Sequence, residues 1–323
     1  MNIAFAGFRH YHIMTLYEMA EKNPDTNIVA CYEANEDARN KAVSTHNVNF
    51  THATYEDVLN DKNVEVVAIG DYYSIRGQMV IQALKAGKHV ICDKPICTDL
   101  KELDEIERLH KETGLVVMCM LDLRYAHYSE KAKELIESGK IGKLTIGAFT
   151  AQHCLAYGTR PGWYFEEGCH GGTINDIAIH GVDLFRYMTG KELSKINYAK
   201  TWNLYADKHP HFKDCGQFVA EMGDFTISAD VSYASPACNV TLPTYWEFTI
   251  WGLKGMMRFN YAEKVIRIYT DKEEIIELDA VEAPLIENLM DEIKGIKTRL
   301  NTDDILKSQR QVLEIQKFAD DNA

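Results

Sequence analysis

Two segments of this chain carry the side chains best suited to acid–base chemistry. In residues 171–183 a Gly-Gly pair opens an apolar segment in which Asp176 and His180 are four residues apart, so on a helix they share one face. An imidazole titrates near pH ~6.5 and exchanges a proton readily at neutral pH. Lys94 follows the apolar run 88–92, which is typical of a buried parallel strand, and open α/β sheets bind ligands at the carboxyl ends of such strands. The pattern predicts a proton-transfer site.

A hydride-transfer reaction would use these groups in complementary ways. It requires a group that takes or gives the hydroxyl proton of a carbinol and a nearby charge that stabilises the oxygen. His180 and Lys94 suit those two roles, and Asp176 would either orient the imidazole or hold a substrate hydroxyl. A single histidine in an apolar helix is usually a packed core residue, and a single lysine usually lies on the surface. The joint pattern, rather than either residue alone, therefore favours catalysis.

The size and charge of the chain limit its class. Its 323 residues can bury a sizeable core and favour two domains. The net charge is -13 and no basic stripe is present, so neither nucleic acid nor an anionic membrane is an expected partner. No apolar run approaches the roughly twenty residues of a membrane helix, and residues 1–7 lack a basic region or a cleavage site, which favours a cytoplasmic protein.

Cysteine and histidine usage argues against a disulfide framework or a metal centre. The eight cysteines are scattered in mostly apolar context, so reduced structural thiols are expected. His10, His12 and the spacing of Cys92 and Cys97 do not suggest a tetrahedral set with a matching second half. We therefore expect no metal site.

The two halves of the chain differ in periodicity. The first alternates helical spacing with short apolar runs and predicts a doubly wound parallel sheet, with strands at 2–6, 27–32, 64–69, 90–92 and 115–120. After one more helix at 129–137, runs between 144 and 269 that alternate apolar with polar residues predict an antiparallel sheet, before the chain returns to helix at 285–295 and 302–319. Aromatic residues are dense in these runs, so an uncovered face would indicate a subunit partner.

A partial dinucleotide-binding loop follows the first strand. Gly7-Phe8-Arg9-His10-Tyr11-His12 runs from strand into helix but keeps only the first glycine of the usual fingerprint. Arg9 would either clash with a pyrophosphate or pair with it, and Gly7 alone is equally consistent with a simple tight turn. Glu33 ends the second strand, where a carboxylate can accept both ribose hydroxyls of NAD, although it would also suit a loop cap. Ala34 offers no charge for a 2′-phosphate, so NAD is preferred over NADP.

Three motifs in order resemble the Gfo/Idh/MocA oxidoreductase family, the group of glucose-fructose oxidoreductase and inositol dehydrogenase. Residues 83–95 (ALKAGKHVICDKP) resemble the family's ALxAGKHVxxEKP signature. Residues 135–142 resemble its LIxSGxIG turn, and residues 171–183 resemble its GGGxLxDxGxHxxD segment. The similarity extends over essentially the whole chain.

The resemblance implies a Rossmann domain, here residues 1–121, followed by an α/β domain with an open, mostly antiparallel sheet, residues 122–323, which binds substrate and forms oligomers. It implies an NAD(P)-dependent dehydrogenase or reductase of a sugar, inositol or related polyol, assembled as a homo-dimer or homo-tetramer. Carried over by motif, the catalytic residues are Lys94, Asp176 and His180. Arg124 and Trp163 join Asp176 and His180 as predicted substrate contacts, although packing is the commoner role of a tryptophan. The predicted cofactor contacts are Gly7, Phe8, Arg9, His10, His12, Glu33, Gly70, Asp71, Tyr72, Arg76, Asp93, Lys94 and Pro95.

Departures from the family pattern leave other functions open. Residues 70–76 (GDYYSIR) replace the usual Thr-Pro-Asn-x-x-His loop, Asp93 replaces a Glu, and residues 124–127 differ from Arg-Phe-Asn-Pro. Arg76 and Arg124 would bind an acidic substrate group or simply pair with carboxylates. One alternative is a closed redox cycle in which NAD is used transiently for net glycoside hydrolysis. Another is a nucleotide- or sugar-sensing regulator without turnover.

Overall fold

The computed structural model describes residues 1–238 and 240–322, so residue 323, the end of the predicted second domain, lies outside the described residues. The chain divides into two compact units. The first unit comprises Met1–Leu121, Pro161–Gly171 and Pro284–Gln309, and the second comprises Asp122–Arg160, Gly172–Ala283 and Arg310–Ala323. The division therefore differs from a single cut after residue 121, because the chain returns twice to the first unit.

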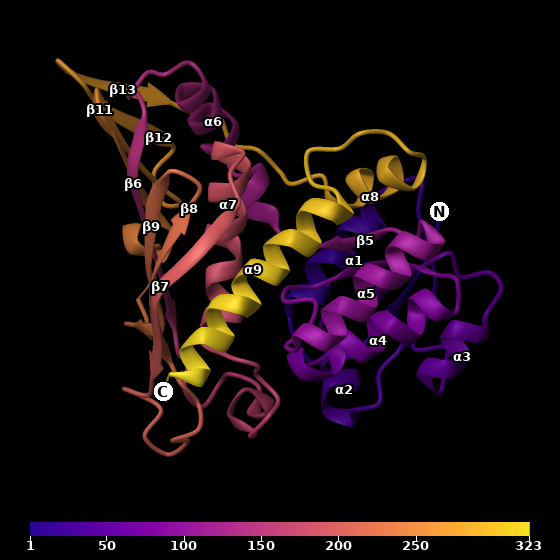
Figure 1. Ribbon diagram of the computed structural model, residues 1–323. Helices are drawn as coiled ribbons and strands as arrows, with labels where there is room; N and C mark the ends of the chain where they lie inside the picture. Colours follow the sequence, from indigo (N-terminus) through magenta and orange to yellow (C-terminus); the bar gives the residue numbers. More distant parts are fainter. Residues whose placement is uncertain (239, 323) are drawn as a thin grey trace. The chain divides into compact units, whose positions relative to one another are not determined.

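A parallel five-stranded sheet forms the centre of the first unit (Figure 1). Its order is β2-β1-β3-β4-β5, which confirms the predicted doubly wound architecture. Apolar side chains dominate these short strands because helices cover both faces of such a sheet. The strands are β1 (Asn2–Ala6), β2 (Asn27–Tyr32), β3 (Val66–Ile69), β4 (His89–Cys92) and β5 (Val117–Cys119).

Three helices of the first unit are bounded by recognisable capping residues. Asn35 accepts the N–H of Ala38 at the start of α2, Thr54 and Asp57 form a capping box at α3, and left-handed Gly114 ends α5. Right-handed crossovers place α1 on one face and α4 and α5 on the other, and accordingly α1 contacts α8 while α4 contacts α5. The helices are α1 (His12–Lys22), α2 (Glu36–His46), α3 (Tyr55–Asn60), α4 (Tyr73–Lys85), α5 (Leu100–Thr113) and α8 (Leu285–Ile293).

The strand order creates a topological switch point between β1 and β3. The chain leaves β1 toward one edge of the sheet and leaves β3 toward the other, so the loops after these two strands diverge. Ligands of open α/β sheets bind in the crevice at such a point. The loop that begins at Gly7 and the loop that begins at Gly70 both start there.

An eight-stranded sheet forms the second unit, in the order β13-β12-β11-β10-β6-β9-β8-β7. Every neighbouring pair is antiparallel except β6 and β9, which run parallel, so the prediction of an open, mostly antiparallel sheet is confirmed. Strand β13 was not expected, because its sequence EEIIE is mostly charged. The strands are β6 (Leu144–Cys154), β7 (Leu193–Trp202), β8 (Cys215–Met222), β9 (Phe225–Ser235), β10 (Glu247–Gly252), β11 (Gly255–Asn260), β12 (Val265–Tyr269) and β13 (Glu273–Glu277).

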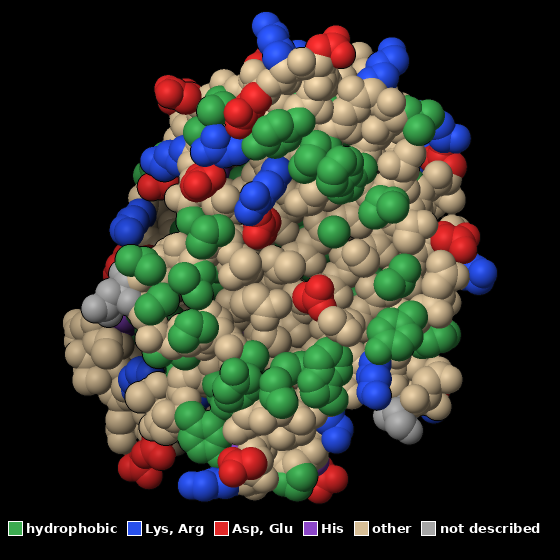
Figure 2. Space-filling view, turned by 90° about the vertical axis from the view of Figure 1, so that its left-hand side faces the viewer, with side chains coloured by type: hydrophobic (Ala, Val, Ile, Leu, Met, Phe, Trp, Pro, Cys, Tyr) green, Lys and Arg blue, Asp and Glu red, His purple; other side chains and the backbone are tan. Residues whose placement is uncertain are grey.

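The two faces of this sheet differ. Helices α6 (Ser129–Glu137) and α7 (Ile179–Thr189) lie against one face of the sheet (Figure 1). In the core of this unit Phe149 contacts Phe185, Phe218 and Phe248. Gly181 permits this approach, since a Cβ there would lie 2.3 Å from the Phe149 ring. Figure 2 looks onto the other face and shows hydrophobic side chains gathered in groups across it.

The last helix, α9 (Thr302–Asp321), begins in the first unit and ends in the second. None of the helices within residues 1–238 and 240–322 is both long enough and apolar enough to cross a membrane. None of the eight cysteines, all of them among the described residues, forms a disulfide, and the Cys238 side chain is exposed.

Candidate active site

The loop after β1 approaches the loop after β3 closely. Gly7 has a φ of +81°, and a Cβ at this position would lie 2.6 Å from the Cβ of Asp71, so only glycine fits. The N–H of Gly7 donates to Tyr32 and the N–H of His10 donates to Gly70, at 3.0 and 3.1 Å. Gly7 therefore does more than permit a turn, because it brings the two loops of the switch point into contact.

Glu33 lies at the end of β2 with a fully buried carboxylate. One oxygen accepts the N–H of Phe8 and the other accepts the N–H of Asn35 at 2.6 Å. Arg9 covers this group, with Nε 3.9 Å from Glu33 and 3.4 Å from Asp71. Burial raises the pKa of Glu33, and the neighbouring Asp71 charge raises it further. The Phe8 ring itself packs in the core rather than facing a ligand.

These residues fit a dinucleotide in spite of the lost glycines. Helix α1 begins after Tyr11 with no side-chain cap and no acidic residue in its first turn, so the positive end of its dipole suits a phosphate. The N–H groups of Ile13 and Met14 already donate to the carbonyl oxygens of His10 and Tyr11, at 3.3 and 2.9 Å. Arg9 Nε is buried and makes no hydrogen bond among the described residues. Each Glu33 oxygen keeps a lone pair for a ribose hydroxyl. Pyrophosphate at the start of α1 and ribose at Glu33 therefore match the donors and acceptors present.

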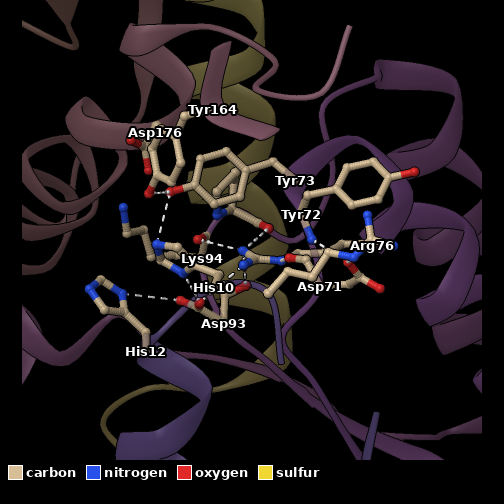
Figure 3. A network of polar contacts seen from close by, with 12 residues as sticks. His10, His12, Asp71, Tyr72, Tyr73, Arg76, Asp93, Lys94, Tyr164 and Asp176 are labelled. Atoms are coloured by element: carbon tan, nitrogen blue, oxygen red, sulfur yellow. Dashed lines mark hydrogen bonds and ion pairs between the residues drawn. The ribbon is translucent and has the colours of Figure 1, made fainter. Parts of the chain in front are cut away.

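A buried charge network follows β4. His10 Nδ1 donates to Asp93, and Arg76 donates to the same carboxylate at 3.0 Å (Figure 3). Burial lowers the pKa of His10 to about 3, so its imidazole is neutral. Burial opposes the charge on Asp93, but its neighbours hold its pKa well below the ordinary value, and Arg76 is the cation that does so.

Arg76 supports the segment after β4 and the start of the loop after β3. Its side chain is fully buried, and it also donates to the carbonyl oxygens of Asp71, Lys94 and Pro95, at 2.6, 2.6 and 3.2 Å. The sequence left open whether Arg76 binds a ligand or pairs with a carboxylate, and in the structure it pairs.

Tyr73 connects this network to an aromatic cluster in the first unit. Its hydroxyl lies 3.2 Å from His10 Nε2 and 2.8 Å from the hydroxyl of Tyr164 (Figure 3). Trp163 stacks on Tyr164 with ring centroids 4.1 Å apart, and its indole N–H donates to the backbone carbonyl oxygen of Arg9 at 3.2 Å. Trp163 is thus packed in this cluster, the commoner role. Lys94 is 5% exposed, with its ammonium 5.9 Å from the Tyr73 ring centroid.

The second unit carries Asp176 and His180. The segment Ile174–Ala178 is a π-helical turn that continues into α7, and such turns are frequent at functional sites. The expected regular helix therefore starts only at Ile179. The hydroxyl of Tyr233 donates to Asp176, and the His180 ring packs edge-on to Trp246, with Nδ1 3.7 Å from Asp122.

Helix α9 holds the start of this turn through Gln316. Its side-chain oxygen accepts the N–H groups of Ile174 and Asn175, at 3.0 and 3.3 Å, and its amide donates to Asp320 at 2.9 Å. Gly172, with a φ of +100°, leaves room for this side chain, since a Cβ there would lie 2.2 Å from the Gln316 amide carbon. The interaction satisfies the first N–H groups of the turn.

Arg124 does not have the environment expected for a substrate contact. It is 1% exposed, and its guanidinium donates to both carboxylate oxygens of Asp183, from Nε at 3.0 Å and from Nη2 at 2.5 Å. A buried bidentate pair of this kind stabilises the unit, and a contact of Arg124 with substrate stays a prediction.

Three features of the site were not identified from the sequence. Tyr233 and Gln316 are far from Asp176 along the chain, and no local pattern links them. His10, His12 and Asp93 form a group of potential metal ligands, although no metal site was expected. The His-x-His pair in the loop after the first strand was the available signal.

Comparison with known proteins identifies the family. Residues 1–121 match the profile described as "Oxidoreductase family, NAD-binding Rossmann fold", and residues 129–258 match the "GFO/IDH/MocA C-terminal domain". The chain belongs to the Gfo/Idh/MocA oxidoreductase family, as its motifs predicted.

Individual relatives are more distant. The levoglucosan dehydrogenase of Pseudarthrobacter phenanthrenivorans is 28% identical, with 53% of this chain and 44% of the relative covered. The scyllo-inositol 2-dehydrogenase (NAD(+)) of Bacillus subtilis is 30% identical, with 44% and 40% covered. The chain thus spans about half the length of the curated relatives it matches, or less. A solved structure from Erwinia carotovora atroseptica, 23% identical, superposes with a TM-score of 0.87 over 99% of this chain and 98% of that one, which shows the shared fold.

Proposed function

We propose that this protein is an NAD-dependent dehydrogenase or reductase that acts on a secondary hydroxyl of a sugar, inositol or related polyol. One observation carries the proposal. In this chain, a member of the family, Lys94 follows β4, while Asp176 and His180 lie on consecutive helical turns. All three side chains are nearly buried. Burying an ionisable group costs folding free energy, and such groups occur preferentially at functional sites.

Each side chain has a defined role in the proposed reaction. His180 takes the hydroxyl proton during oxidation and returns it during reduction, while the Lys94 ammonium stabilises the oxygen as negative charge develops. Asp176, held by Tyr233, orients a substrate hydroxyl or the imidazole. A bound nicotinamide supplies the hydride acceptor, so that the carbinol loses one hydride and one proton as its C–O bond becomes a carbonyl.

Support for the substrate class comes from the relatives. Two of them are named for levoglucosan and scyllo-inositol, which are both cyclic compounds with several hydroxyl groups. Preference for NAD over NADP is supported by Glu33, because its buried carboxylate would repel a 2′-phosphate and its free lone pairs would accept ribose hydroxyls.

We also propose that the uncovered face of the second unit's sheet forms a homo-oligomer. Ile146, Trp251, Met256 and Tyr269 are consecutive cross-strand neighbours on β6, β10, β11 and β12, so they form one row across that face. Ile146 and Trp251 are 53% and 48% exposed in the single chain. Light scattering should find a dimer or tetramer that Trp251→Glu weakens, while Val43→Glu on α2, at a residue of comparable exposure, leaves it unchanged.

Cofactor binding and turnover together test the proposed reaction. Calorimetry should find that NAD binds at least about tenfold more tightly than NADP. A panel of inositols, levoglucosan and aldoses should then yield NADH absorbance with at least one member. His180→Ala and Lys94→Met should each lower kcat by about 10²- to 10⁴-fold, whereas the exposed His211→Ala should not.

The remaining outcomes separate the alternative functions. Tight NAD binding with no turnover would contradict the dehydrogenase and favour the sensor. Substrate cleavage without net NADH release would favour the closed redox cycle. Failure of both nucleotides to bind would mean that the Arg9-containing loop has lost its cofactor.

A further inference from the structure

The loop after β1 and the segment after β4 hold metal-ligating side chains that have no proton-transfer role in the proposed reaction. His10 and His12 lie at the start of α1 and Asp93 follows β4, and one ligand atom of each can be chosen so that all three lie within 4.8 Å of one another. The geometry points to a binding site for a divalent transition-metal ion at His10, His12 and Asp93, entirely within the first unit.

The donor set suits a borderline cation. Two imidazoles and one carboxylate are the ligands of many catalytic zinc sites, and the same set with open positions also binds other first-row metals. Three protein ligands leave at least one position for water or for an oxygen of a bound molecule. The set contains no thiolate, the ligand that favours soft metal ions, so it suits borderline ions such as Zn²⁺.

The spacing is close to that of a bound ion. Bonds of about 2.0–2.2 Å place two ligands of a tetrahedral ion about 3.3–3.6 Å apart. His12 Nδ1 already lies 3.3 Å from Asp93 Oδ1. A pair at the limit of 4.8 Å would have to close by about 1 Å, and the His12 side chain, which is 46% exposed, can supply this by rotation.

Asp93 provides a second and independent observation. Its side chain is fully buried, and Oδ1 makes no hydrogen bond among the described residues, although it faces His12. Arg76 donates to the opposite oxygen, Oδ2, so its charge is directed away from the atom that would bind the ion. An unsatisfied buried carboxylate oxygen is costly, and a cation would remove that cost.

Residues around the cluster are placed as supporting contacts of a metal ligand. If Nδ1 of His10 binds the ion, the ring proton moves to Nε2, which lies 3.2 Å from the Tyr73 hydroxyl. The Tyr73 hydroxyl can then accept a hydrogen bond from the Nε2–H group of His10 and donate its own proton to the Tyr164 hydroxyl oxygen, 2.8 Å away. A histidine ligand usually has such a partner on its second nitrogen, which fixes its tautomer and ring orientation.

Metal titration tests this site without requiring turnover or nucleotide. Reduced, metal-free full-length protein with Cys238→Ser, which removes the exposed thiol, is titrated with Zn²⁺ in a calorimeter. We expect one ion per chain. His12→Gln should weaken binding by about 100-fold with an unchanged Tm in the absence of metal, because this residue is half-exposed. Asp93→Asn should weaken binding as well.

A matched control and a spectrum complete the test. His46→Gln removes a histidine that faces the Glu18 carboxylate at 3.0 Å but belongs to no three-ligand group among the described residues, so it should bind Zn²⁺ like the parent. Co²⁺ should give ligand-field bands without a thiolate charge-transfer band. Absence of a one-to-one complex, an affinity unchanged in His12→Gln, or a thiolate band would each overturn the assignment.

Discussion

The Tyr233 hydroxyl donates a hydrogen bond to the Asp176 carboxylate, although the two residues come from different elements of the second unit, β9 and the π-helical turn before α7. Both side chains are almost completely buried. A buried carboxylate depends on such donors, because it has lost its hydration. Tyr233 is therefore a positioning residue for Asp176.

Tyr233→Phe should weaken both stability and catalysis. Loss of a donor to a buried carboxylate costs about 1–3 kcal/mol, which urea unfolding would measure. If Asp176 positions substrate in the proposed reaction, kcat should fall more than KM changes, because the substitution leaves the pocket volume nearly the same. Tyr198→Phe, at an exposed tyrosine on β7, is the control, and equal stability of the two variants would contradict the role of Tyr233.

The buried pair of Arg124 and Asp183 makes a separate prediction. Arg124→Met should cost roughly 3–5 kcal/mol of unfolding free energy, because it removes the guanidinium that pairs with the buried Asp183 carboxylate. The double variant Arg124→Met with Asp183→Leu should recover a large part of that loss, since apolar replacement of a whole buried pair is often nearly neutral. Equal instability of the single and double variants would show that the pair is not the main interaction of either residue.

Much of the fold could be predicted from the sequence because its signals are local. Period-two and helical spacing identified the strands of both sheets and the terminal helices, and the family motifs placed Lys94, Asp176 and His180. Strand β13 escaped because charged residues suit an exposed edge strand, where burial does not select its composition.

Long-range contacts of the candidate site could not be predicted in the same way. Whether Arg124 faces a ligand or Asp183, and whether Trp163 faces substrate or Tyr164, depends on packing between distant segments, which periodicity does not encode. The same holds for Gln316 at the start of the π-helical turn and for the approach of Asp93 to His12. For Arg124 and Trp163 the residue type suggested two roles, and the fold shows the contacts that each makes.

Gly172 and Gln316 should be interdependent. Gly172→Ala introduces a side chain at a φ of +100° and a contact of 2.2 Å with Gln316, so it should cost more than about 1–3 kcal/mol, the usual strain of such a backbone position. Gly139→Ala is the matched control, because it has a φ of +68° but no neighbour within 4 Å of the new Cβ. Thermal and urea unfolding should find Gly172→Ala clearly less stable than Gly139→Ala. The reverse order would refute the dependence of the Gln316 contact on glycine at position 172.

The carboxyl group of Glu292 should make stability depend on pH. Burial raises the pKa of Glu292, although the N–H of Thr302 donates to Oε1 at 2.8 Å, and Oε2 is buried with no hydrogen bond among the described residues. A raised pKa means that the folded state binds the proton more tightly than the unfolded state. This group therefore destabilises the fold above its folded pKa, and the penalty disappears as the pH falls below the unfolded value, near ~4.3.

Glu292→Gln removes the charge and with it this pH dependence. The unfolding free energy of the variant minus that of the wild type should be larger at about pH 8 than at about pH 5. The reason is that only the wild type gains stability from protonation at this position as the pH falls. Urea unfolding of both proteins at the two pH values gives the difference directly. A pH-independent difference for Glu292→Gln would show that its carboxyl group titrates as it does in the unfolded chain.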